Sequence, residues 1–496
     1  MDDEFVIGVD SSTQMTKAVA WSRTGEALGE GRAPVEMSRP QEGWFEQDPE
    51  NWWSSFCEAV RQLGQSVDLT RAAALSLSNQ RETIGFLDAD GKPVRPGMVW
   101  LDERAAYLID EFADRVGAEK LHAITGKPVD VTPPVYRMEW LRRHEPDMLA
   151  KAAKILDVNA YLTSRLSGKA TASWTSADPS GVFDLAQKRW SPDVLDALGL
   201  DETRFASVVA PGCKTGTVTA DAAGAAGLPQ GLTVIAGGGD GQCAGLGGNA
   251  VRQGTAYLNL GTAIIVGAWS REPRVSKSWR TMSSPTGDGY FLEGVLRAGT
   301  FFVDWFVRNV ARGTPDAKTF AELTEAAARL PIGSEGLLVS PYLSGCMNPH
   351  WSMDARAAFF GMTPQHEPGH LYRAVLEALT GEIARSIRDI KAEGVEVDSV
   401  VAVGGGAVSD FWLKMIADAS GVPVQISSTI EASSLGAAIT AAVGLGWYSD
   451  FDSAAAAMTS TRDAQEPSSS TRAQWDALLE RQDALNRIVV EHSRSR

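Results

Sequence analysis

Residues 232–242 read LTVIAGGGDGQ, and this stretch decides which fold class the chain can adopt. The first five residues are apolar and partly β-branched, which is typical of a short buried strand. Glycines follow where the backbone has to turn without room for a Cβ atom. Because α/β folds place their chemistry at strand ends, we expect Asp240 there, on a loop. An acid after glycines is either a turn residue or a functional carboxylate, and the rest of the chain must decide between them.

Length and charge limit the class of protein. A chain of 496 residues exceeds what one hydrophobic core usually supports, so two large domains are expected. A hydrophobic fraction of 44% is normal for a globular protein and argues against disorder. The net charge of −16 disfavours a nucleic-acid partner, because proteins that bind phosphate backbones are usually basic. It does not exclude ATP, which local amides and metal ions bind.

The cysteines and the N-terminus indicate a cytoplasmic protein. Cys57, Cys213, Cys243 and Cys346 show no metal-ligand spacing, so we interpret them as reduced thiols. The acidic residues 2–4 are unlike the start of a signal peptide. No apolar run is long enough to span a bilayer, so no membrane partner is expected.

Two strand-like runs near the N-terminus, residues 5–10 and 18–21, are joined by a turn rich in hydroxyl groups. Backbone amides and hydroxyls in such a turn can bind a phosphate, and an adjacent lysine adds positive charge. Asp10, at the end of the first run, can bind Mg²⁺ directly or through water. The alternative is an ordinary hairpin whose hydroxyls only satisfy the turn. The candidate phosphate-binding residues are Ser12, Thr13 and Lys17.

The same design recurs later in the chain. Residues 254–260 and 264–267 are strand-like, and the turn between them contains Gly261 and Thr262. We interpret this as a second phosphate hairpin in a second domain, since a repeated unit is more informative than either copy. The first domain then covers residues 1–249 and the second covers residues 250–496.

A further glycine-rich turn follows the apolar run 400–403. Glycines there let a nucleotide approach the backbone, and the helix that follows offers free N–H groups at its start. Gly405, Gly406 and Asp410 are therefore candidate nucleotide-binding residues. Gly299 lies between a strand-like run and a helix and is a further candidate.

Five polar residues, 79–83, separate the strand-like runs 72–78 and 84–87. Arg81 and Glu82 can hydrogen-bond vicinal hydroxyls, because one side chain donates and the other accepts. The alternative is a surface ion pair of little consequence. A run of five polar residues between two buried strands favours the functional interpretation.

Four stretches together resemble the FGGY carbohydrate kinases, a branch of the actin-like, ribonuclease-H-like ATPase superfamily. They are residues 9–13, 44–53, 260–262 and 404–410. In the second of them, Asp48 and Pro49 also predict the start of an amphipathic helix that ends near Leu63. The resemblance implies two similar α/β domains, each a five-stranded mixed sheet flanked by helices, with an interdomain cleft. It implies ATP and Mg²⁺ as cofactors and a small sugar or polyol as substrate, and it is compatible with a homodimer.

The resemblance also implies roles for single residues. Asp240 falls at the position of the family's general base, which accepts a proton from the substrate hydroxyl that attacks the γ-phosphate of ATP. Asp10 and Asp240 would hold the metal. The substrate would contact Gln80, Arg81, Glu82, Asp240 and Gln242. The nucleotide would contact Ser12, Thr13, Lys17, Gly261, Thr262, Gly299, Gly405, Gly406 and Asp410.

The substrate is indicated less directly. The motif at residues 79–83 is that of the glycerol kinase branch, whereas residues 237–240 and 93–104 are closer to the xylulokinase branch. Gly241 stands where the family usually has an amide side chain, and we expect Gln242 to replace it. We favour a ketopentose or small polyol kinase that converts D-xylulose to xylulose 5-phosphate. A glycerol or tetritol kinase and a non-enzymatic nucleotide-binding regulator are the alternatives.

Overall fold

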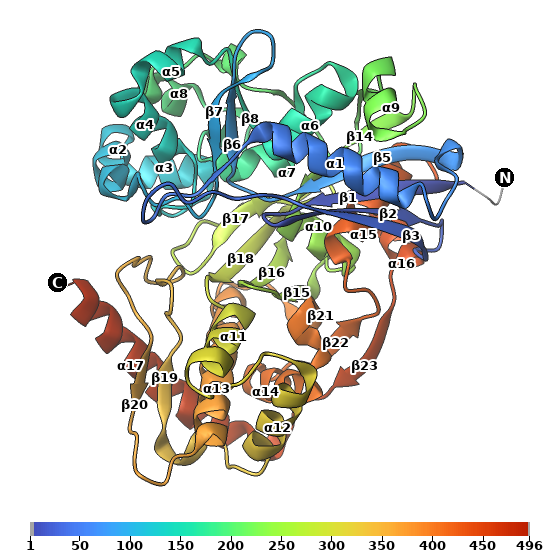
Figure 1. The fold of residues 1–496 in the computed structure, drawn as a ribbon. Helices are drawn as coiled ribbons and strands as arrows, with labels where there is room; N and C mark the ends of the chain where they lie inside the picture. Colours follow the sequence, from blue (N-terminus) through green and yellow to red (C-terminus); the bar gives the residue numbers. More distant parts are fainter. Residues whose placement is uncertain (1–3, 495–496) are drawn as a thin grey trace.

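The computed structural model describes residues 4–494, which form two lobes stacked on each other (Figure 1). A six-stranded sheet in the order β13-β14-β5-β1-β2-β3 forms the centre of the first lobe. A seven-stranded sheet in the order β17-β18-β16-β15-β21-β22-β23 forms the centre of the second. Two lobes with mixed sheets confirm the predicted fold class. The five strands expected per sheet were wrong, because short strands extend both sheets at their edges.

The strands of the first sheet combine parallel and antiparallel pairs. β1 pairs antiparallel with β2 and parallel with β5, and β5 pairs parallel with β14. Their bounds are β1 (Phe5–Ser11), β2 (Met15–Trp21), β3 (Ala27–Pro34), β5 (Ala72–Asn79), β13 (Lys214–Thr217) and β14 (Thr233–Gly239).

The second sheet repeats this arrangement. β15 pairs antiparallel with β16 and parallel with β21, and β21 pairs parallel with β22. The order β23-β22-β21-β15-β16-β18 therefore matches the whole first sheet strand for strand, which supports the duplication expected from the two hairpins. The bounds are β15 (Gly254–Leu260), β16 (Ile264–Ser270), β17 (Arg280–Ser283), β18 (Tyr290–Leu296), β21 (Val397–Val403), β22 (Val424–Ser427) and β23 (Thr461–Gln465).

Smaller sheets surround the two central ones. β4, β6, β7 and β8 form a four-stranded sheet in the first lobe, and three two-stranded ribbons complete the strands. The remaining bounds are β4 (Glu46–Gln47), β6 (Ile84–Leu87), β7 (Pro93–Met98), β8 (Lys154–Asp157), β9 (Thr171–Ser173), β10 (Phe183–Asp184), β11 (Arg189–Trp190), β12 (Ser207–Val209), β19 (Leu338–Ser340) and β20 (Ala358–Phe360).

The helices of the first lobe include the one predicted from Asp48 and Pro49. Helix α1 spans Pro49–Leu63, and the Asp48 side chain accepts a hydrogen bond from the backbone N–H of Glu50, as expected of an N-cap. The others are α2 (Ile109–Val116), α3 (Ala118–Thr125), α4 (Val135–His144), α5 (Pro146–Lys151), α6 (Val158–Ser167), α7 (Trp174–Ala177), α8 (Pro192–Leu198), α9 (Ala220–Ala226) and α10 (Asp240–Gly247).

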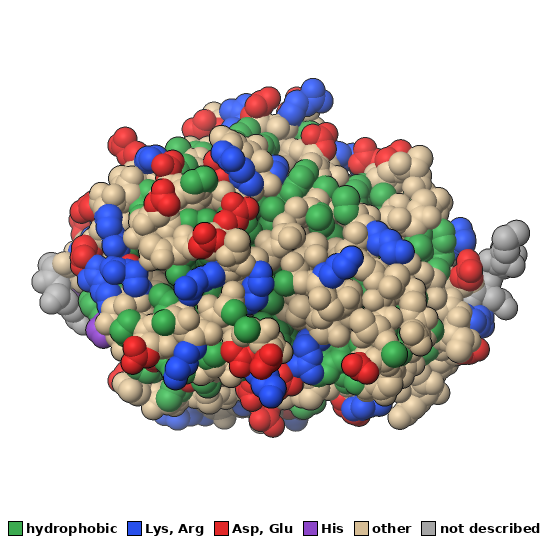
Figure 2. All heavy atoms as spheres, turned by 90° about the horizontal axis from the view of Figure 1, so that it is seen from above, with side chains coloured by type: hydrophobic (Ala, Val, Ile, Leu, Met, Phe, Trp, Pro, Cys, Tyr) green, Lys and Arg blue, Asp and Glu red, His purple; other side chains and the backbone are tan. Residues whose placement is uncertain are grey.

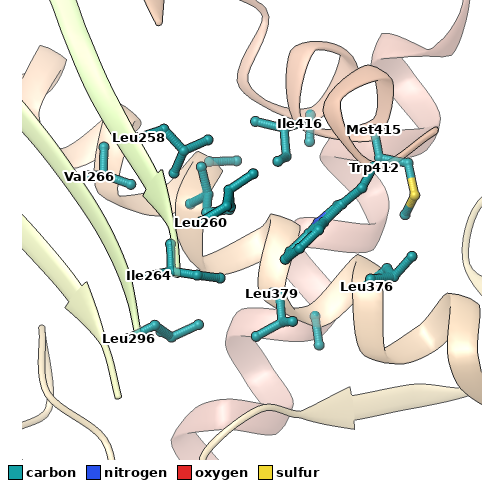
Figure 3. Close-up of a cluster of buried hydrophobic side chains, with 14 of the residues drawn as sticks. Leu258, Leu260, Ile264, Val266, Leu296, Leu376, Leu379, Trp412, Met415 and Ile416 are labelled. Carbon is teal, nitrogen blue, oxygen red and sulfur yellow. The ribbon is translucent and has the colours of Figure 1, made fainter. Parts of the chain in front are cut away.

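The second lobe has a core of its own. Figure 3 shows Trp412 of α14 beside Leu376 and Leu379 of α13, with Leu260 and Ile264 across from it. The helices of this half are α11 (Thr300–Asn309), α12 (Ala317–Ala328), α13 (Pro368–Ala392), α14 (Asp410–Ser420), α15 (Ala432–Gly444), α16 (Phe451–Met458) and α17 (Arg472–Arg494).

Helices α10 and α15 lie side by side between the two sheets (Figure 1). Their backbones come so close that a Cβ atom on Gly436 would lie 1.9 Å from the carbonyl oxygen of Cys243. A Cβ atom on Gly8 of β1 would lie 2.1 Å from the carbonyl oxygen of Ser434. Helix α15 thus packs on the first sheet although it comes late in the chain. The predicted boundary between two domains at residue 249 stays a prediction. Helix α15 follows that boundary in the chain but packs on the sheet that precedes it.

The surface carries charges of both signs. On the face seen from above in Figure 2, basic and acidic side chains are interspersed. Among residues 4–494, no helix is long and apolar enough to cross a bilayer.

The contact between α10 and α15 gives the first prediction. Replacing Gly436 by alanine places a methyl group against a backbone carbonyl that cannot move freely. We expect Gly436→Ala to lower the free energy of unfolding by about 1–3 kcal/mol, measured by denaturant titration. The matched control is Gly224→Ala in α9, where a Cβ atom meets nothing within 4 Å. That variant should be roughly 0.5–1 kcal/mol more stable than the wild type. Equal effects of the two substitutions would contradict the close backbone contact between α10 and α15.

Candidate active site

Asp240 is the first residue of helix α10, directly after strand β14. The expectation of a loop was therefore wrong. The glycines do not turn the chain; they let β14 lie against β5, since a Cβ atom on Gly237 would be 2.0 Å from the carbonyl oxygen of Leu77. At this helix start, the Asp240 Oδ1 atom accepts a hydrogen bond of 2.7 Å from the N–H of Gly241. The positive end of a helix favours a carboxylate, so the site holds Asp240 in a fixed orientation.

Arg81 lies beside Asp240 and is almost completely buried. Its Nε atom is 3.2 Å from Asp240 Oδ1, and its Nη1 atom is 2.8 Å from Glu293 Oε2. A Cβ atom on Gly241 would lie 2.7 Å from Arg81 Nη2. That contact explains why residue 241 is glycine: the guanidinium occupies the space that a side chain would need.

The two glutamines predicted to contact the substrate both form hydrogen bonds with other groups of the protein. Gln242 accepts a hydrogen bond of 3.0 Å from Arg81 Nη1 and donates one of 3.1 Å to the carbonyl oxygen of Thr175. Gln80 donates to Gln47 Oε1 over 2.9 Å and accepts from the hydroxyl of Thr83 over 3.0 Å. Both glutamines are buried, and contact of either one with a substrate stays a prediction.

Glu82 is buried and pairs with Arg280 rather than with its neighbour Arg81. Arg280 Nη1 lies 2.7 Å from Glu82 Oε1, and Arg280 belongs to β17 of the second lobe. The alternative of a surface ion pair between Arg81 and Glu82 is therefore wrong. Glu82 also has a left-handed backbone with φ of 58°, which turns the chain between β5 and β6.

Arg280, Glu293 and Tyr257 are part of this cluster and were not predicted. Glu293 is fully buried in β18, and the hydroxyl of Tyr257 donates a hydrogen bond of 2.6 Å to its Oε1 atom. The only sequence signal was an acid within the apolar run 291–296. Its partner could not be identified, because Arg81 lies 212 residues away along the chain.

Asp10 lies near the end of β1 and Asp240 follows the end of β14, close enough that the charge of Asp240 acts on Asp10. Burial and, to a smaller extent, the nearby charge of Asp240 raise the pKa of Asp10 to about 7, although Ser78 donates a hydrogen bond of 2.8 Å to Asp10. Burial also raises the pKa of Asp240, and the positive charge of Arg81 partly offsets this effect. Asp240 keeps 37% of its side-chain surface exposed, so it remains accessible to a substrate.

This pair of acids fits a divalent cation. The charge of Asp240 disfavours ionisation of Asp10, and a cation near both would relieve this effect. Mg²⁺ is typically bound by one or two carboxylates together with phosphate oxygens and water. Within residues 4–494, no cluster of three or more potential metal-ligating side chains is present. If Mg²⁺ binds here, Asp10 and Asp240 are the side chains that would hold it, with phosphate and water oxygens as further ligands.

The first hairpin turn places its predicted residues close together. Ser12 donates a hydrogen bond of 2.7 Å to the carbonyl oxygen of Met15, and the Thr13 hydroxyl accepts one of 2.9 Å from Trp100 Nε1. The Thr13 hydroxyl proton stays available for an incoming acceptor. The Lys17 ammonium lies 2.8 Å from Glu431, just before α15. A role of Lys17 toward phosphate stays a prediction.

The second hairpin turn contacts the start of α11. The N–H of Gly299 donates to the carbonyl oxygen of Thr262 over 2.8 Å, and the N–H of Thr300 donates to that of Gly261 over 3.0 Å. A Cβ atom on Gly299 would lie 2.9 Å from the carbonyl oxygen of Gly261. Glycine at position 299 therefore lets the turn and the helix start meet.

A cavity of about 740 Å³ opens beside this turn. Gly405, Gly406 and Asp410 line it together with Thr300, and their contact with a nucleotide stays a prediction. Ligand pockets are typically apolar with a few polar groups, and this cavity combines apolar side chains with the glycine-rich backbone. Its other lining residues are Val303, Asp304, Ala317, Phe320, Ala321, Thr324, Glu325, Tyr372, Leu376, Val408, Ser409, Phe411 and Trp412.

Comparison with known proteins identifies the family. Residues 5–247 match the model of the N-terminal domain of the FGGY family of carbohydrate kinases, and residues 256–445 match that of its C-terminal domain. The chain therefore belongs to the FGGY family of carbohydrate kinases, and it is an ATP-dependent sugar kinase.

Curated relatives cover most of the chain. A xylulose kinase of Escherichia coli is 31% identical over 418 residues, which cover 84% of this chain and 84% of that protein. A xylulose kinase of Staphylococcus epidermidis is 28% identical over 471 residues, covering 94% and 93%. A gluconokinase of Bacillus subtilis is 23% identical over 465 residues, covering 92% and 91%.

Solved structures show the same fold. A xylulose kinase from Rhodospirillum rubrum has a TM-score of 0.91 at 25% identity, covering 99% of this chain and 100% of that one. A ligand-bound xylulose kinase from Lactobacillus acidophilus has a TM-score of 0.92 at 23% identity, covering 98% of both chains. A glycerol kinase from Plasmodium falciparum with ADP has a TM-score of 0.86 at 21% identity, also covering 98% of both.

The carboxylate pair gives the second prediction. Asp10→Asn keeps the shape and the hydrogen bond from Ser78 but removes one charged ligand. The Mg²⁺ concentration needed for half-maximal activity should rise at least about 10-fold, measured by metal titration at saturating nucleotide and sugar. Asp450→Asn, at the N-cap of α16, is the control and should leave the titration unchanged. Superimposable titrations of the Asp10 variant and the wild type would exclude Asp10 from the metal site.

Proposed function

We propose that this kinase transfers the γ-phosphate of ATP to a hydroxyl of a neutral ketopentose or small polyol, with D-xylulose to xylulose 5-phosphate as the favoured reaction. The observation that carries the proposal is the position of Asp240. It lies at a helix start and at a strand end, beside Asp10 and in contact with Arg81. A carboxylate oriented by the helix start, partly exposed and with a raised pKa, suits a general base.

In the proposed mechanism, Asp240 accepts the proton of the substrate hydroxyl as that oxygen attacks the γ-phosphate. Arg81 orients the acceptor and the oxygen of Asp240 that accepts the proton. Phosphoryl transfer needs little covalent chemistry from the protein, so positioning and charge neutralisation contribute most of the rate enhancement. Mg²⁺ held by Asp10 and Asp240 would neutralise charge that develops on the phosphates.

The donor would bind on the second lobe. The base of ATP would enter the cavity of about 740 Å³ against Gly405 and Gly406. Its phosphates would extend toward the two hairpin turns, where Ser12, Thr13, Gly261 and Thr262 lie. The helix starts at Thr300 and Asp410 lie at the same cavity and add N–H groups and positive potential.

The charge balance around the acceptor favours a neutral substrate. Arg81 already faces Glu293 and Asp240, and Glu82 already faces Arg280. A carboxylated acceptor such as an aldonate would need a cation that is not already neutralised, since a buried unpaired charge is strongly unfavourable. This argues for a ketose or polyol over gluconate, although a gluconokinase is among the similar proteins.

A glycerol or tetritol kinase is the second candidate. It is supported by the motif at residues 79–83, which resembles that of the glycerol kinase branch, where an arginine and a glutamate bind polyol hydroxyls. The alternative of a non-enzymatic nucleotide-binding regulator has less support, because the chain belongs to an enzyme family and contains both Asp10 and Asp240.

A panel of acceptors tests the substrate. D-xylulose, D-ribulose, glycerol, erythritol and gluconate would be compared in a coupled ADP-release assay with Mg²⁺ and ATP. We expect the highest kcat/KM with D-xylulose and the lowest with gluconate. A preference for glycerol or erythritol would establish the second candidate, and a preference for gluconate would contradict the charge argument.

The role of Asp240 is tested by Asp240→Asn. The amide keeps the shape of the side chain but cannot accept the proton, so kcat should fall by on the order of 10²–10⁴-fold. Affinities for sugar and nucleotide, measured by calorimetry, should change much less. Asp450→Asn serves again as the matched substitution outside the site. Near wild-type turnover of the Asp240 variant would exclude it as general base.

A further inference from the structure

Glu293 is a buried acid on a strand that otherwise presents apolar side chains. It is 0% exposed, and its neighbours Phe291 and Leu292 belong to the cores of the protein. A buried carboxylate is unfavourable unless it is paired and hydrogen-bonded, so the groups that pair with Glu293 indicate what it does. The pKa of Glu293 is lowered: burial would raise it, but the charges of Arg81 and Arg280 outweigh burial. Glu293 is therefore ionised and acts as an anion.

The contacts of Glu293 converge on one side chain of the other lobe. Arg81 Nη1 donates to both carboxylate oxygens, at 3.0 and 2.8 Å. Tyr257 fixes Oε1 from the neighbouring part of the second sheet, and Arg280 Nη2 lies 3.4 Å from Oε2. Glu293 is thus itself held in place by two side chains of its own lobe, while it holds Arg81 from across the lobe boundary.

Arg81 lies between two anions. Its Nε atom contacts Asp240 and its Nη1 atom contacts Glu293. The two carboxylates therefore attract the guanidinium from different sides. Gln242 adds a third contact on the Glu293 side. Without Glu293, the attraction of Arg81 to Asp240 would no longer be opposed, and a closer ion pair would make the Asp240 carboxylate a weaker base.

We propose that Glu293 is a positioning residue for the acceptor site: from the second lobe it holds Arg81 at the distance from Asp240 that substrate binding and proton transfer require. Glu82 is held in the same way by Arg280 of the second lobe, over 2.7 Å. Both charged side chains of the 79–83 motif therefore depend on strands β17 and β18. The acceptor site is complete only when the two lobes are together. This inference rests on the proposed function, because Arg81 is assigned to the acceptor there.

The test is Glu293→Gln, which keeps the volume and removes the charge. Kinetics would be measured with the best acceptor of the panel, varying sugar and ATP separately. We expect the sugar KM to rise and kcat to fall, each by roughly 10-fold or more, with the ATP KM changed less than about 2-fold. A loss of folded enzyme would instead lower the apparent kcat alone. In an Arg81→Gln background, Glu293→Gln should add little, because coupled residues are not additive.

The matched control is Glu377→Gln. Glu377 is a buried acid of α13 that pairs with Arg373 over 2.7 Å, away from the acceptor. This variant should unfold at a lower temperature but keep both KM values and kcat. Tyr257→Phe is the second test, because it removes only the hydroxyl that holds Glu293. It should raise the sugar KM in the same direction by a smaller factor, and it decides the question if Glu293→Gln does not fold.

The outcomes separate the two proposals. Unchanged sugar KM and kcat in Tyr257→Phe and in folded Glu293→Gln would overturn the role of Glu293 and leave the proposed function intact. Additive losses in the double variant would also overturn it. A wild-type enzyme that phosphorylates none of the panel would overturn the proposed function and this inference together.

Discussion

The buried contact of Arg81 with Asp240 on one side and Glu293 on the other is the interaction on which the site depends. It joins the first lobe, which supplies Arg81 and Asp240, to strand β18 of the second lobe. Buried charges are stable only when they are paired, so Arg81 and Glu293 require each other's lobe to be in place. It also explains the glycines around Asp240: residues 239 and 241 lack side chains because the Arg81 side chain fills that space.

Close backbone packing supports the cluster from behind. Helices α10 and α15 touch at glycines, and α15 packs on β1 of the first sheet. Because Asp240 begins α10, its position depends on this helix pair. Each of the two matching sheets carries one hairpin turn, between β1 and β2 in the first lobe and between β15 and β16 in the second. Each lobe thus contributes one hairpin turn and charged side chains to the site: Arg81 and Asp240 come from the first lobe, and Glu293 comes from the second.

Much of the fold could be predicted from local sequence. The hairpins, the helix after Asp48 and the two-lobed class follow from short patterns, and the structure confirms them. The position of Asp240 on a loop was wrong, because glycines can serve close strand packing as well as turns. Arg280 and Glu293 were missed, since their partners are about 200 residues away and only the docking of the lobes brings them together. Sequence shows residue types but not which way an amide faces: the hydrogen bonds of Gln80 and Gln242 to protein groups were not predicted, and their contact with substrate stays a prediction.

A crystal structure with D-xylulose and a non-hydrolysable ATP analogue is the most direct test of the account. We expect the sugar to contact Arg81 and its reacting hydroxyl to lie about 2.6–3.2 Å from an oxygen of Asp240. We also expect the γ-phosphate on the far side of that hydroxyl and the Arg81 pair with Glu293 intact. A sugar bound with its hydroxyls turned away from Asp240, or an Arg81 that leaves Glu293 in the complex, would contradict the account.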